Sequence, residues 1–385
     1  MIGVGGAEAE TAPSGEQTSF GLGIWCEFMP YAQVVEHLPL LAAYDCELIL
    51  HVRSESLEDP DFMRLLRAAE QAEVAVVAWL LLPVEEHLYV GQASVEATRK
   101  LARRAADYFD KHHLRVQGFV FDCEPSPLLG REMFTAVRAL SVRQLARILR
   151  RQLDAEEFHR DTAALNALTQ ELRERGYQVN GAVNRAFLDA QARGNLALED
   201  GLNAPVSGVT WDTLSFITYR YGASQLSYVA MLNRYSLLAQ RLYGERAAMD
   251  VGLLGDYDHI PENAERAELF GGGAFFYSFL RGMSSTHDLE EAVGVVLGCG
   301  VRQINLYALD GAVDSVAGLE NWLKAARRAR PRTMWGRWTP VRSVHYGVLG
   351  TMMEKLFRWF TGGSEATHGR IVFREPAIGA GERQP

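Results

Sequence analysis

The sequence predicts a (β/α)8 barrel, on the basis of three observations. Between residues 20 and 328, eight short apolar segments alternate with segments of helical periodicity. Such alternation is typical of a parallel sheet with crossover helices, and about 310 residues suit a barrel that carries insertions. No glycine-rich turn follows the first strand segment, which disfavours the main alternative, an open doubly wound sheet with a dinucleotide site.

The expected elements follow one another in a regular order. Strands are expected at residues 21–28, 46–52, 73–82, 116–124, 177–183, 213–221, 248–254 and 301–309. They are apolar and rich in β-branched or aromatic residues, and Pro83 and Pro125 end two of them. Helices are expected at residues 34–44, 61–72, 94–112, 131–175, 224–242, 289–298 and 316–328.

Three stretches exceed what a minimal barrel needs. Residues 131–175 are helical throughout but too long for one crossover, so we expect two or three helices with a break near Asp154–Asp161. A second insertion, residues 185–209, precedes the sixth strand. The third is the loop between strands seven and eight that carries Gly271–Gly273. It lacks the Lys and Ser/Thr of a P-loop, so we expect a plain flexible loop rather than a phosphate site.

The two ends of the chain differ in composition from the barrel region, residues 20–328. Residues 1–19 lack both the basic and the apolar part of a signal peptide, so we expect a disordered tail and a cytoplasmic protein. Residues 329–385 form a basic and aromatic extension with one helix at 341–360. We expect that helix either to cover part of the outer ring of the barrel or to contact a partner or a membrane surface. No apolar run is long enough to span a membrane.

Composition narrows the classes of function. The net charge of −9 and the pI near 5.7 disfavour a nucleic-acid-binding protein and are compatible with a neutral substrate such as a sugar. The four cysteines are scattered without a C-x-x-C pair, so we expect small reduced core residues. No close His pair and no ligand spacing for zinc is seen, so neither a metal nor a cofactor is expected.

The most informative segment is the fourth strand, which ends in two acids. Asp122 and Glu124 are two residues apart, so their side chains project to the same face, roughly 6–7 Å apart at Cβ. Two acids on one face are costly inside a core. They suit the C-terminal mouth of a barrel, where active sites lie.

The other strand ends supply aromatic, acidic and amide side chains. Aromatic rings pack on the apolar faces of sugars, and acids and amides bind hydroxyl groups, so this mixture is typical of a carbohydrate site. The candidate binding residues are Trp25, Glu27, His51, Trp79, Asn184, Tyr219, Arg220, Tyr221, Asp256, Tyr257, Tyr307 and Asp310.

The fourth strand resembles the signature of glycoside hydrolase family 18, the chitinase-like barrels, which runs D-G-x-D-x-D-x-E and here covers Gln117–Glu124. Three further segments are similar to family motifs in the same order. Phe216–Arg220 resembles M-T-Y-D on strand six, and Val251–Tyr257 resembles G-x-P-x-Y-G on strand seven. Ile304–Asp310 lies where the family has a strand-eight Trp.

The chain also departs from the family pattern. Gln117 and Val120 replace two signature acids, and Tyr307 replaces the Trp. Leu80–Pro83 stands where the family has an S-x-G-G turn. Arg220 takes the place of an acid in the sugar-binding subsite; it indicates either an acidic or phosphate-bearing substrate group or an ion pair with Asp122 or Asp256.

The resemblance implies retaining hydrolysis of a glycan that contains N-acetylhexosamine. Glu124 would be the acid and then the base, Asp122 would orient the substrate's acetamido group, and Tyr219 would bind it. Two alternatives stay open. One is a two-carboxylate glycosidase with Asp256 as nucleophile, and the other is an inactive carbohydrate-binding or scaffolding barrel.

Overall fold

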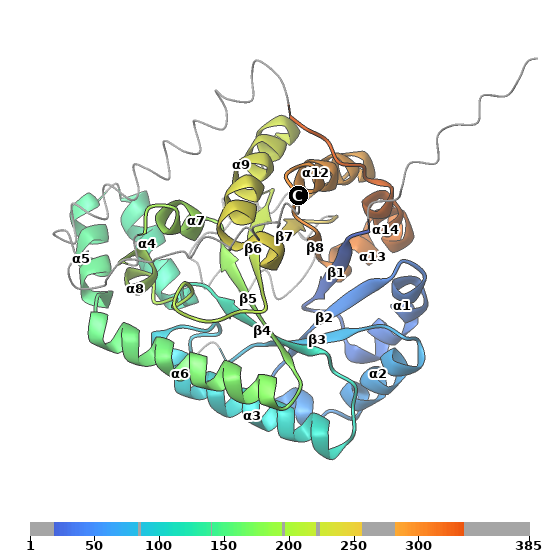
Figure 1. Cartoon of the computed structure of the whole chain (residues 1–385), viewed down its shortest axis with the longest axis horizontal. Coiled ribbons are helices and arrows are strands. Elements are labelled where there is room, and N and C mark those ends of the chain that lie inside the picture. The colour runs from blue at the N-terminus through green and yellow to red at the C-terminus, as the bar shows by residue number, and fades with distance from the viewer. Residues whose placement is uncertain are drawn as a thin grey trace, which may run out of the picture.

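The structure, a computed structural model, is a closed eight-stranded parallel barrel surrounded by helices (Figure 1). It describes residues 19–83, 86–139, 141–194, 197–220, 224–255 and 282–334. Each strand pairs in parallel with the next along the chain, and β8 closes on β1. The (β/α)8 fold class predicted from the sequence is confirmed.

The strands lie within or at the edges of the predicted segments. They are β1 (Gly21–Cys26), β2 (Cys46–Val52), β3 (Val76–Leu80), β4 (Gly118–Cys123), β5 (Gln178–Asn184), β6 (Thr213–Tyr219), β7 (Ala247–Gly252) and β8 (Gln303–Tyr307). The helices are α1 (Tyr31–Ala43), α2 (Pro60–Gln71), α3 (Val95–Lys111), α4 (Pro127–Arg138), α5 (Val142–Gln152), α6 (Ala155–Glu174), α7 (Ala186–Gln191), α8 (Ala197–Gly201), α9 (Gln225–Tyr243), α12 (Thr286–Gly298), α13 (Leu309–Asp314) and α14 (Gly318–Arg328).

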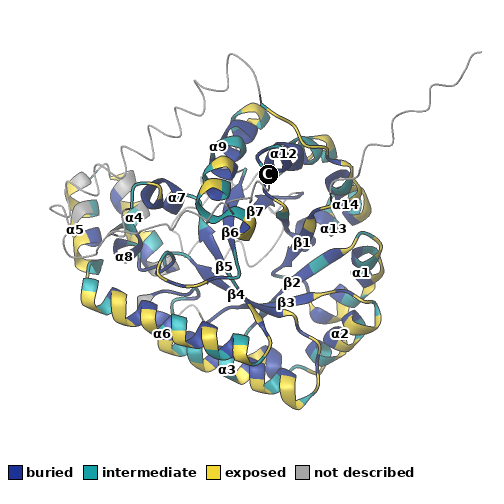
Figure 2. Ribbon diagram, viewed as in Figure 1, coloured by how far each residue is buried: buried dark blue, intermediate teal, exposed yellow. Residues whose placement is uncertain are grey.

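Side-chain alternation along the strands creates two apolar regions. Outward side chains such as Phe119, Phe121 and Cys123 of β4 pack under the helices in the large outer core. Figure 2 shows the strands buried, whereas the outer faces of α3 and α6 are exposed. The inner core fills the barrel and consists of Trp25, Ile49, Val77, Trp79, Leu81, Leu88, Val120, Ala182, Ile217, Tyr219, Leu253 and Ala308.

Polar side chains also occupy the barrel interior, and a glycine makes room for one of them. A Cβ atom at Gly23 would lie 2.7 Å from Oδ1 of Asn305, the residue paired with it on β8. A larger residue at position 23 would therefore have to displace the Asn305 amide, and glycine leaves room for it beside β1.

The predicted insertions after β4 and β5 are present. The long helical segment divides into α4, α5 and α6, and the expected break falls at Leu153–Asp154, where the Asp154 side chain caps α6 by accepting from the N–H of Glu157. The short helices α7 and α8 lie in the second insertion. Figure 1 shows α4, α5, α7 and α8 gathered on one side of the barrel, beside β4 and β5.

Several predictions fall on parts of the chain outside the described residues. These are the tail up to residue 18, the loop with Gly271–Gly273, and the extension from residue 335 with its expected helix at 341–360. Among the described helices, none is long and apolar enough to cross a membrane.

Candidate active site

Strand β4 positions the two acids predicted from the sequence at the C-terminal mouth of the barrel. Val120, Asp122 and Glu124 share the inward face, with Val120 in the inner core. Asp122 is paired with Ala182 of β5 and is buried, at 5% exposure. Glu124 follows the last strand residue and is only half-buried. Of the two acids, Glu124 is therefore the one that solvent reaches more readily.

The surroundings of Glu124 favour its protonated form. Its Oε1 accepts a long hydrogen bond, 3.5 Å, from Nδ2 of Asn184 at the end of β5. Burial raises the pKa of Glu124 to about 7; the Asn184 bond and the charge of Arg185 oppose this, and the charges of Asp250 and Glu27 add to it. A carboxyl group with this pKa keeps its proton in about half of the molecules at neutral pH, and that proton can be donated.

Asp250 on β7 is a buried carboxylate that the sequence reasoning missed. It has no exposed surface and lies inside the barrel. Its Oδ1 accepts from Nδ2 of Asn305 at 2.8 Å and from Nε1 of Trp25 at 3.2 Å, and its Oδ2 accepts from Oγ of Ser215 at 2.8 Å. All three donors are neutral, and burial raises the pKa of Asp250 to about 6. Asp250 therefore links β1, β6 and β8 through one carboxylate.

Two tryptophans continue this network toward the mouth. The Trp25 ring meets the Trp79 ring edge to face, with centroids 4.9 Å apart and planes at 81°. Both are almost fully buried. Within the described part of the chain, Nε1 of Trp79 has no hydrogen-bond partner. A buried donor without a partner is costly, so Trp79 offers a hydrogen bond to a ligand or a water molecule.

Two tyrosines lie together at the ends of β6 and β8, and Tyr307 is the register partner of Trp25 on the adjacent strand. The rings of Tyr219 on β6 and Tyr307 on β8 have centroids 4.5 Å apart, with planes tilted by 31°. The Tyr307 hydroxyl donates a short hydrogen bond to Oε2 of Glu27, which follows β1. The structure thus brings Tyr219, Tyr307 and Glu27 into one contiguous group.

Two of the predicted binding residues have their polar groups engaged within the protein. Arg220 pairs with Asp288 of α12 at 2.8 Å, so the ion-pair interpretation of this arginine applies, with a carboxylate from a distant part of the sequence. Asp310 accepts from the backbone N–H groups of Glu27, Phe28 and Met29. Burial raises its pKa to about 6. Asp310 anchors the chain that follows β1, and with it Glu27.

His51 lies at the edge of the site and is held by its neighbours. Its ring stacks on Tyr31 of α1, with centroids 5.0 Å apart, and its Nδ1 lies 3.3 Å from the carbonyl oxygen of Cys26. Burial lowers the pKa of His51 to about 4. At neutral pH this histidine is uncharged, so it can offer a neutral hydrogen-bonding edge but not a cation.

Three further predicted residues, Tyr221, Asp256 and Tyr257, lie outside the described residues. Among the residues that are described, no group of three or more His, Cys, Asp or Glu side chains is placed to hold a metal ion. The described side chains of the candidate site that could take part in catalysis or binding are therefore carboxyls, aromatic rings and amides.

The chain matches no protein-family model and no curated protein. Among solved structures it is similar to the spore cortex-lytic enzyme SleL of Bacillus megaterium QM B1551, with 11% identity, a TM-score of 0.49, and coverage of 84% of this chain and 77% of that one. A putative α-L-fucosidase of Bacteroides thetaiotaomicron VPI-5482 gives 9% identity, a TM-score of 0.48, and coverage of 83% and 98%. A D-allulose 3-epimerase of Methylomonas sp. gives 12% identity and a TM-score of 0.41, with coverage of 88% of this chain and 100% of that one. These similarities are too distant to carry an argument about activity.

Proposed function

We propose that the protein is a glycosidase that cleaves a glycan containing N-acetylhexosamine, with Glu124 as its acid and base. The observation that carries the proposal is the state of Glu124: a half-buried carboxyl at the end of β4 whose pKa is raised to about 7. The Tyr307 ring, which is only partly buried and lies against Tyr219, is suited to the apolar face of a sugar.

The proposed reaction begins when Glu124 gives its proton to the glycosidic oxygen as the bond to the anomeric carbon breaks. The substrate's own acetamido oxygen closes onto that carbon, so the configuration is retained. Glu124, now a carboxylate, takes a proton from the water that opens the cyclic intermediate. Asp122 would hold the acetamido nitrogen and balance the positive charge, and Tyr219 would donate to the same group. Neither a metal nor a cofactor is needed for these steps.

A second candidate function is carbohydrate binding without turnover. It is favoured by Val120, which packs in the apolar inner core where the resembled signature has an acid. In this case the aromatic and amide groups would still hold a sugar. Without an acid at position 120, however, the groups around Glu124 would not support cleavage. The third candidate, with Asp256 as nucleophile, depends on a residue outside the described part of the chain.

The substitution Glu124→Gln tests the proposal. It keeps the shape and the Asn184 contact but removes the transferable proton, so we expect the rate of reducing-end release from N-acetylhexosamine oligosaccharides to fall by a factor of about 10³ or more. The melting temperature should not decrease, and Glu156→Gln, on the exposed surface of α6, serves as a control with unchanged activity. Equal turnover by wild type and Glu124→Gln would refute the proposal. Binding of such sugars by both proteins without turnover would establish the second candidate.

A further inference from the structure

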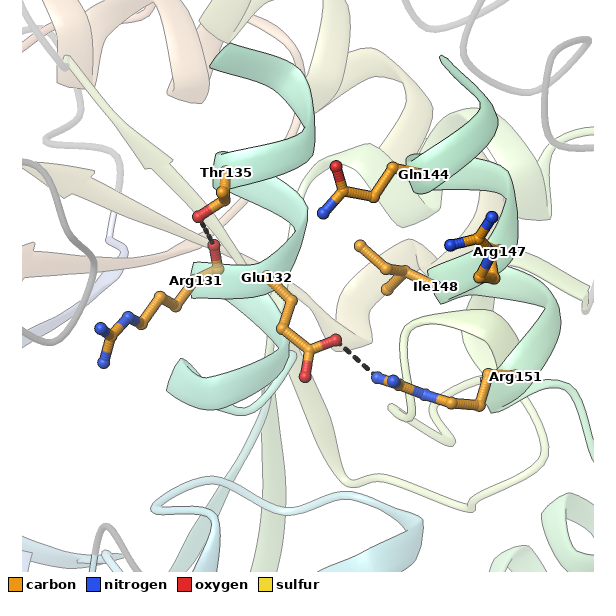
Figure 3. Close-up of a pocket in the computed structure, with 7 residues that line it drawn as sticks. All are labelled: Arg131, Glu132, Thr135, Gln144, Arg147, Ile148 and Arg151. Atoms are coloured by element: carbon orange, nitrogen blue, oxygen red, sulfur yellow. Dashed lines mark hydrogen bonds and ion pairs between the residues drawn. The ribbon is translucent and has the colours of Figure 1, made fainter. Parts of the chain in front are cut away.

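The helical insertion after β4 contains a cavity that the proposed reaction does not use. It lies between α4 and α5, has a volume of about 380 Å³, and is lined by Arg131, Glu132, Thr135, Gln144, Arg147, Ile148 and Arg151 (Figure 3). A volume of this size lies in the range of small-molecule sites. Ile148 belongs to the small apolar cluster with Leu129 and Ala136 that joins the two helices, so the cavity has an apolar floor and a polar rim.

The rim of the cavity carries an excess of positive charge. Helix α5 has four arginines and no acid in eleven residues, in a chain whose net charge is −9. Two of them, Arg147 and Arg151, are four residues apart and therefore neighbours on one face of the helix. Arg131 of α4 also lines the cavity, but in Figure 3 its side chain extends away from α5, so Arg147 and Arg151 are the two lining arginines that share one helix.

Carboxylates of the protein neutralise this pair only in part. Glu132 of α4 is the single acid of the lining, and it pairs with Arg151 at 2.5 Å. Both side chains of that pair are about half exposed, so the pair contributes little stability and can be exchanged. Within the described part of the chain, no carboxylate pairs with Arg147. Two like charges at this spacing repel each other, and a bound anion would relieve the repulsion.

We propose that the α4–α5 cavity binds the oxyanion of a small molecule, a carboxylate or a phosphate, between Arg147 and Arg151. Guanidinium groups match the planar or branched oxygens of these anions and can donate to them in pairs. Gln144 and Thr135, whose hydroxyl already donates to the carbonyl of Arg131, add polar groups on either wall. Ile148 would contact the apolar part of the bound molecule. The site is separate from the proposed glycosidase chemistry and does not depend on it.

Titration of the full-length protein with inorganic phosphate, sodium glucuronate and glucose tests this proposal, with the Nε–H signals of the arginines followed by NMR. We expect saturable shifts of the Arg147 and Arg151 signals with at least one of the two anions and none with glucose. The anion that binds more tightly identifies the chemistry of the natural group. Raising the salt concentration from about 0.05 M to about 0.5 M should weaken binding, because these charges are exposed.

Three variants make the test specific. The double variant Arg147→Gln/Arg151→Gln should weaken binding by about tenfold or more, since it removes both charged donors. Glu132→Gln should tighten binding, because it frees Arg151 and removes the competing carboxylate. Arg143→Gln, on the same helix but not lining the cavity, should leave binding unchanged. Non-saturating shifts of all arginines, or full binding by the double variant, would overturn the proposal.

Discussion

At the scale of single residues, the site depends on two carboxyl groups, Glu124 and Asp250, whose pKa values lie above those of the same groups in water. Burial raises the pKa of Glu124 to about 7 and that of Asp250 to about 6. The charge of Asp250 is one of the influences that raise the pKa of Glu124, so the two groups are electrostatically linked. We therefore regard Asp250 as a positioning residue: it orients the Trp25 ring, and its charge adds to the effect of burial on the pKa of Glu124.

The substitution Asp250→Asn tests this link. An asparagine can keep all three hydrogen bonds, with Nδ2 donating to Ser215, but it cannot ionise. We expect the pKa of Glu124 to fall, so the alkaline limb of the pH–rate profile moves to lower pH. Ser215→Ala removes one bond but no charge, and its alkaline limb should stay in place. An unmoved limb in Asp250→Asn would show that Asp250 does not act on Glu124.

Asp250→Asn should also raise the free energy of unfolding above pH 6, because it removes a buried group that ionises there. Between a pH of about 4 and 6, Asp250 is ionised in the unfolded chain but protonated in the native one, so the wild type loses stability as the pH rises. Asp250→Asn avoids this loss. At pH 8 its free energy of unfolding should exceed that of the wild type by about 3 kcal/mol, and at pH 4 the two should nearly agree. Urea unfolding at both pH values measures the difference.

At the scale of elements, the site depends on how the segments after the strands are held. The chain after β1 carries Glu27, and it is fixed from the other end of the sequence by Asp310, the second residue of α13. In the same way, Arg220 after β6 is tied to Asp288 of α12. These contacts join the segments after β1 and β6 to helices that follow later in the chain. They keep the mouth of the barrel in one geometry.

Removing the Asp310 carboxylate should loosen the segment that carries Glu27. Asp310→Ala leaves the buried N–H groups of residues 27–29 without their acceptor, so we expect a loss of about 2–4 kcal/mol in the free energy of unfolding. Asp310→Asn keeps one acceptor oxygen and should lose less. Asp314→Ala, on the exposed end of α13, is the matched control. Identical urea midpoints for Asp310→Ala and the control would show that the anchor is dispensable.

At the scale of the whole molecule, the barrel could be predicted because its signal is repeated eight times. The two acids of β4 could also be found, because strand alternation and the position at a strand end are local properties. Asp250 could not, since one acid in an apolar strand gives no sign of which face it occupies until the register with Ile217 and Asn305 is known. The partner of Arg220 was equally hidden, because Asp288 lies 68 residues away.

The closed fold also predicts how the four cysteines react with thiol reagents, since all four are unpaired and buried and three of them, Cys26, Cys46 and Cys123, lie in the outer core. Burial raises the pKa of each thiol, which makes the reactive thiolate scarce. We expect a thiol reagent at pH 8 to label Cys26, Cys46 and Cys123 only as fast as the protein unfolds, with Cys299, at 9% exposure, reacting first. Fast labelling of Cys26 or Cys123 would show that the barrel opens locally.

The most direct test of the account is a measurement of the pKa of the Glu124 side chain itself. The carboxyl carbons of glutamate can be labelled with ¹³C and titrated by NMR, and the signal that is missing in Glu124→Gln identifies the residue. The account predicts a midpoint near pH 7, well above that of a glutamate in water. A midpoint near or below 4.5 would mean that Glu124 is already a carboxylate at neutral pH, and the proposed acid catalyst would be lost.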